Sequence, residues 1–133
     1  MNRVEHIGIA VKSLATSIPL FEKLLNRQHY KMETVESENV RTAFFFDGDT
    51  KLELLESLST EGVISRFLSQ RGEGIHHIAF EVNDIRSEMK RLAEEGFVLL
   101  DKEPRPGADN KMVCFLHPKS TNGLLIELVM TKP

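Results

Sequence analysis

Four side chains of the 133-residue chain are of the types that bind a divalent metal ion: His6, Glu53, His77 and Glu127. Imidazole nitrogens and carboxylate oxygens are ordinary ligands for such ions, at about 2.0–2.2 Å from zinc. A set of two His and two Glu is intermediate in softness and suits Zn, Co, Ni, Mn or Fe. The two carboxylates would balance the charge of the ion and leave coordination positions for water or substrate. The residue types therefore indicate a metal centre, if the fold brings these distant positions together.

The chain contains two copies of one sequence pattern, each with a histidine at the same point. The segments VEHIGIAV and IHHIAFEV align when His6 is placed on His77, an offset of 71 residues (77 minus 6). At this offset Ser13 and Asp84, both good helix-capping residues, also coincide. Internal similarity of this kind indicates a repeated structural unit. We therefore expect one module that occurs twice.

Hydrophobic periodicity and turn residues predict the elements of each half. In the first half we expect a strand over 4–11, a helix ending at 25, a charged loop over 31–39, and a hairpin of strands over 40–46 and 51–56. A connector over 59–74 contains a short helix. In the second half we expect a strand over 75–82, a helix that Asp84 caps and Gly96 stops, short strands over 97–100, 111–116 and 124–130, and a chain break at 105–107.

Pro19 affects where the first helix is expected to begin. A helix that starts at Ser13 would place Pro19 in its interior, where proline lacks a needed backbone donor. A helix that starts near Ser17 would place Pro19 in its first turn, where proline is tolerated. We therefore expect the regular helix to start near Ser17.

Each half thus consists of a strand, a helix, and two or three further strands. Two half-sheets of this size could each curl and join along an edge into one cupped sheet, which gives an α+β fold. We expect a single domain over residues 1–133, with a first module at about 3–58, a connector at 59–74 and a second module at about 75–131.

Glu53 and Glu127 occupy equivalent last strands, 74 residues apart (127 minus 53). Each lies between apolar neighbours, so strand alternation packs the neighbours on one face and turns the carboxylate into the cup. A lone His or Glu in a strand is usually a packed or solvated residue and not a metal ligand. Four residues of ligand type at equivalent positions of two repeats would arise much more rarely by chance, so they favour the metal site. His76 faces the other way from His77, and we expect it to be structural or at a subunit interface.

The remaining polar candidates are expected to have simpler roles. Glu5, Glu56 and His29 are most simply solvated surface residues. His117 follows a strand and precedes a proline, in a turn that could border the pocket.

Composition limits the class of protein. Hydrophobic residues make up 41% and charged residues 28% of the chain, as in a globular domain, and no apolar run reaches the length of a bilayer span. The formal net charge of −3 argues against a nucleic-acid-binding protein, which usually has a basic face. The single cysteine, Cys114, forms no internal disulfide and favours a reducing, cytoplasmic setting.

The order His6, Glu53, His77, Glu127 on two strand–helix–strand repeats resembles the vicinal oxygen chelate (glyoxalase/bleomycin-resistance) superfamily over nearly the whole chain. Within it the sequence is most similar to the methylmalonyl-CoA epimerases, in the segments HIGIAV, GEGIHHIA, EPRPG, and HPKS followed by LIEL. The first segment is common across the superfamily, whereas GEGIHHIA together with HPKS and LIEL is fairly specific to the epimerases. The resemblance implies paired βαβββ modules, a homodimer, and a divalent ion (Co, Zn, Ni or Mn) held by the four residues.

The resemblance further implies an isomerase that interconverts the R and S epimers of 2-methylmalonyl-CoA through a metal-stabilised enolate. Proton removal on one face and return on the other need two acid/base groups, and Glu127 is the first candidate. Some family members have Gln where this chain has Glu53, with a separate base on the preceding strand, near the place of Thr42. Either Glu53 is both ligand and base, or another group carries the second proton. Lys119 and Ser120 match the epimerase motif and are expected to hold the substrate carboxylate or a CoA phosphate.

Two other functions use the same sequence features. A lactoylglutathione lyase would use the four ligands on a hemithioacetal substrate. A non-catalytic protein that sequesters small molecules would share the fold, but proteins of that type commonly lack the metal ligands that are complete here.

Overall fold

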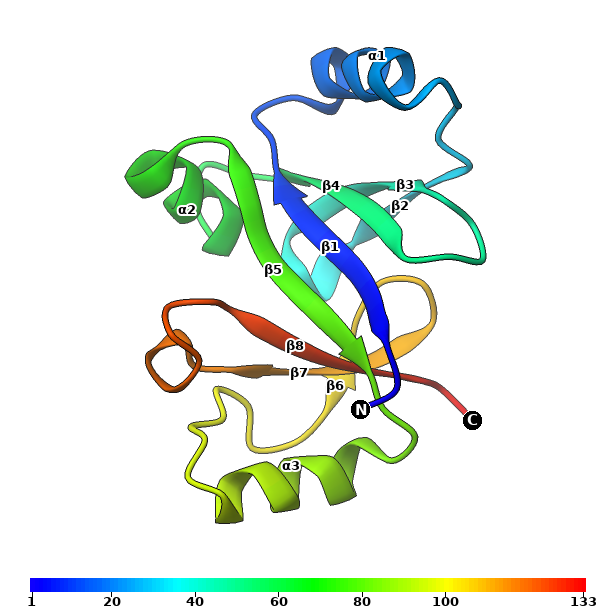
Figure 1. Ribbon diagram of the computed structural model, residues 1–133. Helices are drawn as coiled ribbons and strands as arrows, with labels where there is room; N and C mark the ends of the chain where they lie inside the picture. The colour runs from blue at the N-terminus through cyan, green and yellow to red at the C-terminus, as the bar shows by residue number, and fades with distance from the viewer. The chain divides into compact units, whose positions relative to one another are not determined.

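The computed structural model describes all residues from Met1 to Pro133. The chain divides into two compact units, which are described separately. We call His6–His76 the first unit, and Met1–Glu5 together with His77–Pro133 the second unit. Each unit contains a small mixed sheet with a helix packed on one face (Figure 1).

The first unit carries its strands in the order β2-β3-β4-β1. Strand β1 runs parallel to β4, and the other neighbours are antiparallel. Helix α1 covers the sheet face that carries Ala43, Phe45 and Leu54 (Figure 1). The elements in chain order are β1 (Val4–Ala10, in this unit from His6), α1 (Leu14–Leu25), β2 (Lys31–Val35), η1 (Glu36–Glu38), β3 (Val40–Phe45), β4 (Lys51–Ser57) and α2 (Val63–Arg71).

The second unit carries its strands in the order β5-β8-β7-β6. Strand β5 runs parallel to β8, and the other neighbours are antiparallel. Helix α3 lies along this sheet and packs on Cys114, Leu116 and Leu128 (Figure 1). The elements in chain order are β5 (Gly74–Glu81, in this unit from His77), α3 (Ile85–Glu94), β6 (Arg105–Pro106), β7 (Lys111–Leu116), η2 (Pro118–Ser120) and β8 (Ile126–Thr131).

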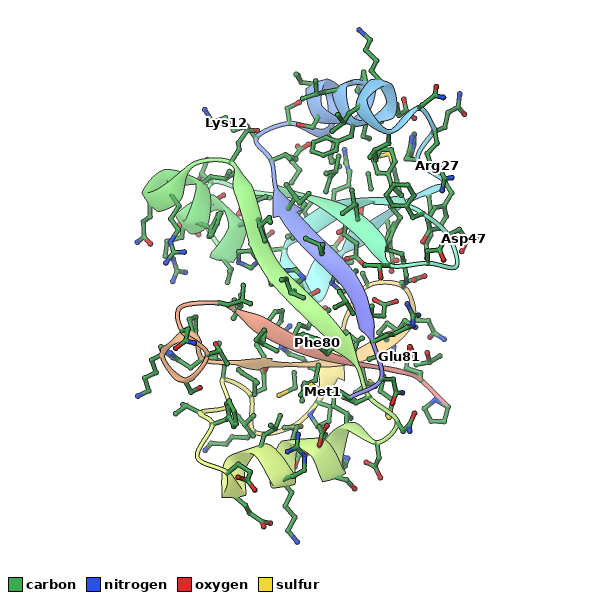
Figure 2. The ribbon with its side chains drawn as sticks, viewed as in Figure 1. Met1, Lys12, Arg27, Asp47, Phe80 and Glu81 are labelled. Carbon is green, nitrogen blue, oxygen red and sulfur yellow. The ribbon has the colours of Figure 1, made fainter.

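The first residues of the chain are bonded to the end of β5, within the second unit. The backbone N–H of Asn2 donates to the carbonyl of Glu81, and the N–H of Glu81 donates to the carbonyl of Arg3, both at 2.9 Å. The guanidinium Nε of Arg3 also donates to the Glu81 carboxylate at 2.8 Å. Met1 accordingly lies close to Glu81 in Figure 2.

The structure confirms the predicted α+β fold with two βαβββ modules. The first module is β1-α1-β2-β3-β4 and the second is β5-α3-β6-β7-β8. The helix caps repeat as well, since Ser13 Oγ accepts the N–H of Thr16 and Asp84 accepts the N–H of Ser87. None of the helices combines the length and the apolar character that crossing a bilayer requires.

Helix α1 begins earlier than Pro19 predicts. It starts at Leu14 and contains Pro19, so the expected start near Ser17 is wrong. Two contacts hold the first turn in place. Leu14 is buried, and its N–H donates to the carboxylate of Glu56 at 2.7 Å. This anchoring outweighs the backbone bond that proline removes.

The segment predicted as a charged loop over 31–39 contains strand β2 and the short helix η1. Strand β2 is at the edge of the sheet and pairs only with β3 in the first unit. Its residues alternate between half-buried Lys31 and Glu33 and exposed Met32 and Thr34. A half-solvated edge strand needs few apolar residues, which is why its charge suggested a loop.

The second unit differs from prediction between α3 and β7. The expected strand over 97–100 reduces to a single bridge between Leu99 and Leu116. The expected chain break at 105–107 instead contains β6, which pairs with β7. Gly107 allows this close approach, because a Cβ at this position would lie 2.7 Å from a methyl group of Val113.

Replacing Asp84 by alanine is expected to lower the free energy of unfolding at neutral pH. The N–H of Ser87 loses its acceptor, which lies at 3.1 Å. That backbone hydrogen bond also lowers the pKa of Asp84 below its ordinary value of 3.8. The carboxylate therefore stabilises the fold above the ordinary pKa, and this stabilisation is lost as the pH falls through the lowered value.

Urea unfolding of the wild type and Asp84→Ala at neutral pH and at about pH 3 tests this expectation. The difference in unfolding free energy should shrink at the lower pH. Asp49→Ala, in an exposed turn, is the control and should leave the unfolding free energy unchanged. A difference between wild type and Asp84→Ala that persists at low pH would contradict the capping role.

Candidate metal and acid–base site

The first unit places His6 beside Glu53. Nδ1 of His6 lies 3.3 Å from Oε2 of Glu53, and both residues are at most 5% exposed. The parallel pairing of β1 and β4 sets this contact, because it puts His6 next to Lys51 and Gly8 next to Glu53. The side chains of His6 and Glu53 thus lie on one sheet face, two residues apart in register.

The apolar neighbours of Glu53 pack on the opposite face. Leu54 is completely buried and, with the partly buried Leu52, belongs to the cluster that packs under α1. A shift of the β4 register by one residue would exchange the two faces and place the carboxylate under the helix. The alternation expected for Glu53 is therefore confirmed.

The second unit repeats this arrangement with His77 and Glu127. Nε2 of His77 lies 3.0 Å from Oε1 of Glu127, and both residues are at most 5% exposed. Phe115 is the register partner of Glu127 on β7, and its ring meets the His77 ring edge-on, with centroids 5.7 Å apart. The aromatic ring fixes the imidazole from the side and helps to exclude water from the pair.

The chemistry and spacing of these side chains fit a divalent metal. All four are buried candidate ligands, and each pair brings one nitrogen and one oxygen donor together. Two ligands at right angles on one ion, each about 2.1 Å away, are about 3.0 Å apart. The observed distances of 3.3 Å and 3.0 Å are close to this separation.

Two cationic side chains near these pairs were missed by the sequence reasoning. Lys51 is only 7% exposed and shares the sheet face of its register partner His6. The spacing Lys51-Leu52-Glu53 was the available signal, since it puts both charged residues on one face of a strand. Lys51 and Glu53 thus place charges of opposite sign on the same buried sheet face.

Arg105 is the second cation, in the second unit. Its guanidinium lies over the Phe115 ring at 5.4 Å from the centroid, and its Nε donates to Asp101 at 3.1 Å. Asp101 also accepts the backbone N–H of Phe115 at 2.9 Å. Asp101 therefore fixes both the strand that carries Phe115 and the cation that covers its ring.

Thr42 lies on β3, in the first unit. It is completely buried, and its hydroxyl has no hydrogen-bond partner within the protein. An unsatisfied buried hydroxyl costs about 1–3 kcal/mol relative to one that is bonded. Such a group needs an explanation in a folded protein.

The other polar residues have structural contacts. The ring of His76 meets Phe67 of α2 edge-on at 5.0 Å, which agrees with a structural role. Glu5 and Glu56 depart from the expected solvated surface, since Glu5 is only 1% exposed and Glu56 binds the first turn of α1. His29 is also held, by Glu22 at 2.9 Å.

The loop that carries Lys119 and Ser120 is held by its own contacts. His117 caps η2, where its Nδ1 accepts the backbone N–H of Lys119 at 3.0 Å. The hydroxyl of Ser120 donates to the carbonyl of His117 and accepts the N–H of Val98. Ser120 therefore shapes the loop, whereas the side chain of Lys119 is exposed.

Cys114 does not supply a nucleophile. It is completely buried, and burial together with the charge of Asp101 raises the pKa of its thiol to about 11. The thiolate, which is the reactive form, is thus disfavoured at neutral pH.

Known proteins of similar sequence and structure include epimerases. The chain is 41% identical to the uncharacterized protein YqjC of Bacillus subtilis, over 99% of this chain and 94% of that protein. It is 38% identical to the ethylmalonyl-CoA/methylmalonyl-CoA epimerase of Cereibacter sphaeroides, over 96% and 97% of the two chains. The structure of a Streptomyces coelicolor methylmalonyl-CoA epimerase with 2-nitronate-propionyl-CoA matches with a TM-score of 0.93 at 31% identity, over 98% and 95% of the two chains.

The family assignment agrees with these similarities and with the repeated modules. Residues 5–115 match the Glyoxalase/Bleomycin resistance protein/Dioxygenase superfamily. The predicted vicinal oxygen chelate fold and the predicted resemblance to the epimerases are therefore confirmed. The chain belongs to the Glyoxalase/Bleomycin resistance protein/Dioxygenase superfamily.

Proposed function

We propose that this chain is a metal-dependent epimerase that interconverts (R)- and (S)-methylmalonyl-CoA. One observation carries the proposal: a buried His–Glu pair recurs at the equivalent place in both units. The similarity to epimerases along nearly the whole chain supports the choice of substrate.

His6, Glu53, His77 and Glu127 would together hold one divalent cation. Two imidazoles and two carboxylates suit Co, Zn, Ni or Mn, and the two carboxylates would neutralise the ion. When bound, the cation would stabilise the negative charge that the thioester carbonyl oxygen gains as the α-proton leaves. Glu53 and Glu127 would then have two roles, as ligands and as proton carriers.

Epimerisation requires that a proton leave one face of the α-carbon and return to the other face. A single carboxylate serves one face, so two groups on opposite sides of the substrate are needed. We assign these roles to Glu127 of the second unit and Glu53 of the first. Burial of both carboxylates keeps water from competing for the proton.

Lys119 and Ser120 complete the proposed substrate site. The exposed ammonium group of Lys119 suits a phosphate of the CoA moiety, which can remain in solvent while the acyl group is enclosed. Ser120 would contribute by fixing the loop that presents Lys119. A homodimer and a cytoplasmic location also remain predictions, and light scattering with size-exclusion chromatography tests the dimer.

Deuterium exchange tests the reaction. Incubating either epimer of methylmalonyl-CoA with the Co²⁺-loaded protein in deuterated water should place deuterium on the α-carbon. Glu127→Gln should reduce exchange from the epimer whose α-proton faces Glu127 by about 100-fold or more, because the amide cannot accept the proton. His76→Ala should leave exchange largely intact, since His76 packs on Phe67.

Two results would overturn this assignment. The wild type could bind metal and show no exchange, or His76→Ala could abolish exchange while Glu127→Gln exchanges both epimers at the wild-type rate. Turnover of methylglyoxal with glutathione, without exchange of the methylmalonyl α-proton, would indicate the lactoylglutathione lyase instead.

Metal content tests the ligand set independently of activity. After Co²⁺ loading and removal of excess ion, elemental analysis should find about one metal per wild-type chain. Replacing His6 or His77 by alanine should weaken metal binding by more than the roughly 10- to 100-fold that loss of an outer-shell partner costs, because a donor to the metal itself is lost. His29→Ala is the matched control, because His29 also pairs with a glutamate but is outside the proposed ligand set. Equal metal content in all four proteins would refute the ligand set.

A further inference from the structure

The hydroxyl of Thr42 is a buried polar group that the internal contacts of the protein leave unexplained. Its residue is 0% exposed, and its Oγ1 has no hydrogen-bond partner. Nearly all buried polar groups in folded proteins are hydrogen-bonded, and each exception calls for an explanation, of which a functional role is one. A valine would fill the same space without a polar atom, so packing alone does not require threonine here.

The register of the sheet places Thr42 near Glu53. On β4, Leu55 is the partner of Thr42 and Glu53 is the partner of Phe44. Register partners share a sheet face, so Thr42 and Glu53 are diagonal neighbours on the face that also carries His6. Diagonal neighbours have Cα atoms about 7–8 Å apart, which one bound ligand group can bridge.

On the other side, Thr42 is the register partner of Glu33 on β2. The carboxylate of Glu33 lies 3.4 Å from Nζ of Lys31, which in turn lies 5.1 Å from the centre of the Phe44 ring. Thr42 is thus a neutral group between two positions that carry carboxylates. At this point the neutral Thr42 hydroxyl can approach an anionic oxygen of a ligand. A carboxylate in the place of Thr42 would repel that oxygen.

We infer that the Thr42 hydroxyl binds the substrate in the first unit, by donating a hydrogen bond to an oxygen of the malonyl group beside Glu53. The identity of this substrate rests on the proposed epimerase function. The bond positions the acyl group so that its α-carbon faces the Glu53 carboxylate. Thr42 is therefore a substrate-binding residue, and it transfers no proton.

Kinetics of deuterium exchange into methylmalonyl-CoA test the role of the hydroxyl. Thr42→Val keeps the shape and removes the hydroxyl, and it should lower kcat/KM by about tenfold or more. Thr42→Ser restores the hydroxyl and should recover most of this loss. The matched control is Thr34→Val, on the exposed face of β2, which should have the activity of the wild type.

Measurements of ligand binding and of thermal stability distinguish a contact of Thr42 with the ligand from a structural role of Thr42. Calorimetric titration with 2-nitronate-propionyl-CoA should give a Kd about tenfold higher for Thr42→Val, and close to wild type for Thr34→Val. Thermal unfolding without ligand should give Thr42→Val a Tm equal to or above that of the wild type, since an unpartnered hydroxyl is removed. A structural role would instead lower the Tm.

The inference and the proposed function fail in different ways. If Thr42→Val exchanges deuterium and binds the probe like the wild type, the role of Thr42 is wrong and the epimerase proposal stands. If Thr42→Ser resembles Thr42→Val in both assays, a hydroxyl is not what the substrate requires, and the inference is also wrong. Absence of exchange in the wild type refutes the epimerase proposal itself, whatever the binding experiments give.

Discussion

Moving a glutamate carboxylate out of water costs several kcal/mol unless a cation or a hydrogen-bond donor faces it. This chain buries such a group twice, at Glu53 and at Glu127, and each time places an imidazole within 3.3 Å. In each unit the two residues come from parallel neighbouring strands, β1 with β4 and β5 with β8. The position of a carboxylate next to its imidazole therefore depends on the register of one parallel pair per unit.

Parallel pairing also explains the helix between those strands. Neighbouring parallel strands require a crossover connection, and helices α1 and α3 lie on the connections. Each helix covers the face of its sheet that is opposite the His–Glu pair. The face with the ionisable side chains is thereby left for a ligand, while the other face provides the apolar core. The same order of elements builds the His–Glu pair of each unit.

Much of this arrangement could be predicted, because local sequence encodes it. The 71-residue offset between His6 and His77 revealed the repeat, and alternation around Glu53 predicted the buried carboxylate. Capping by Asp84 follows from a side chain and the next turn of backbone. These features need no knowledge of distant contacts.

The features that were missed depend on residues far apart in the sequence. Strand β2 is charged, and only its pairing with β3 makes it a strand. The early start of α1 depends on Glu56, which is 42 residues from Leu14. The burial of Lys51 and Thr42 likewise follows from neighbouring strands. From the sequence alone, Thr42 stands out only because some family members have a base near this place. The structure shows in addition that its hydroxyl is buried and unpartnered.

The lone thiol has a practical consequence for studying motion in the second unit. Cys114 lies on β7 with its side chain buried against α3, so we expect an alkylating reagent to reach its sulfur when the helix separates from the sheet. With no other cysteine in the chain, the labelling rate reports that single opening event. Comparing this rate with and without bound acyl-CoA would measure how strongly ligand binding stiffens the region behind Glu127, without any introduced fluorophore.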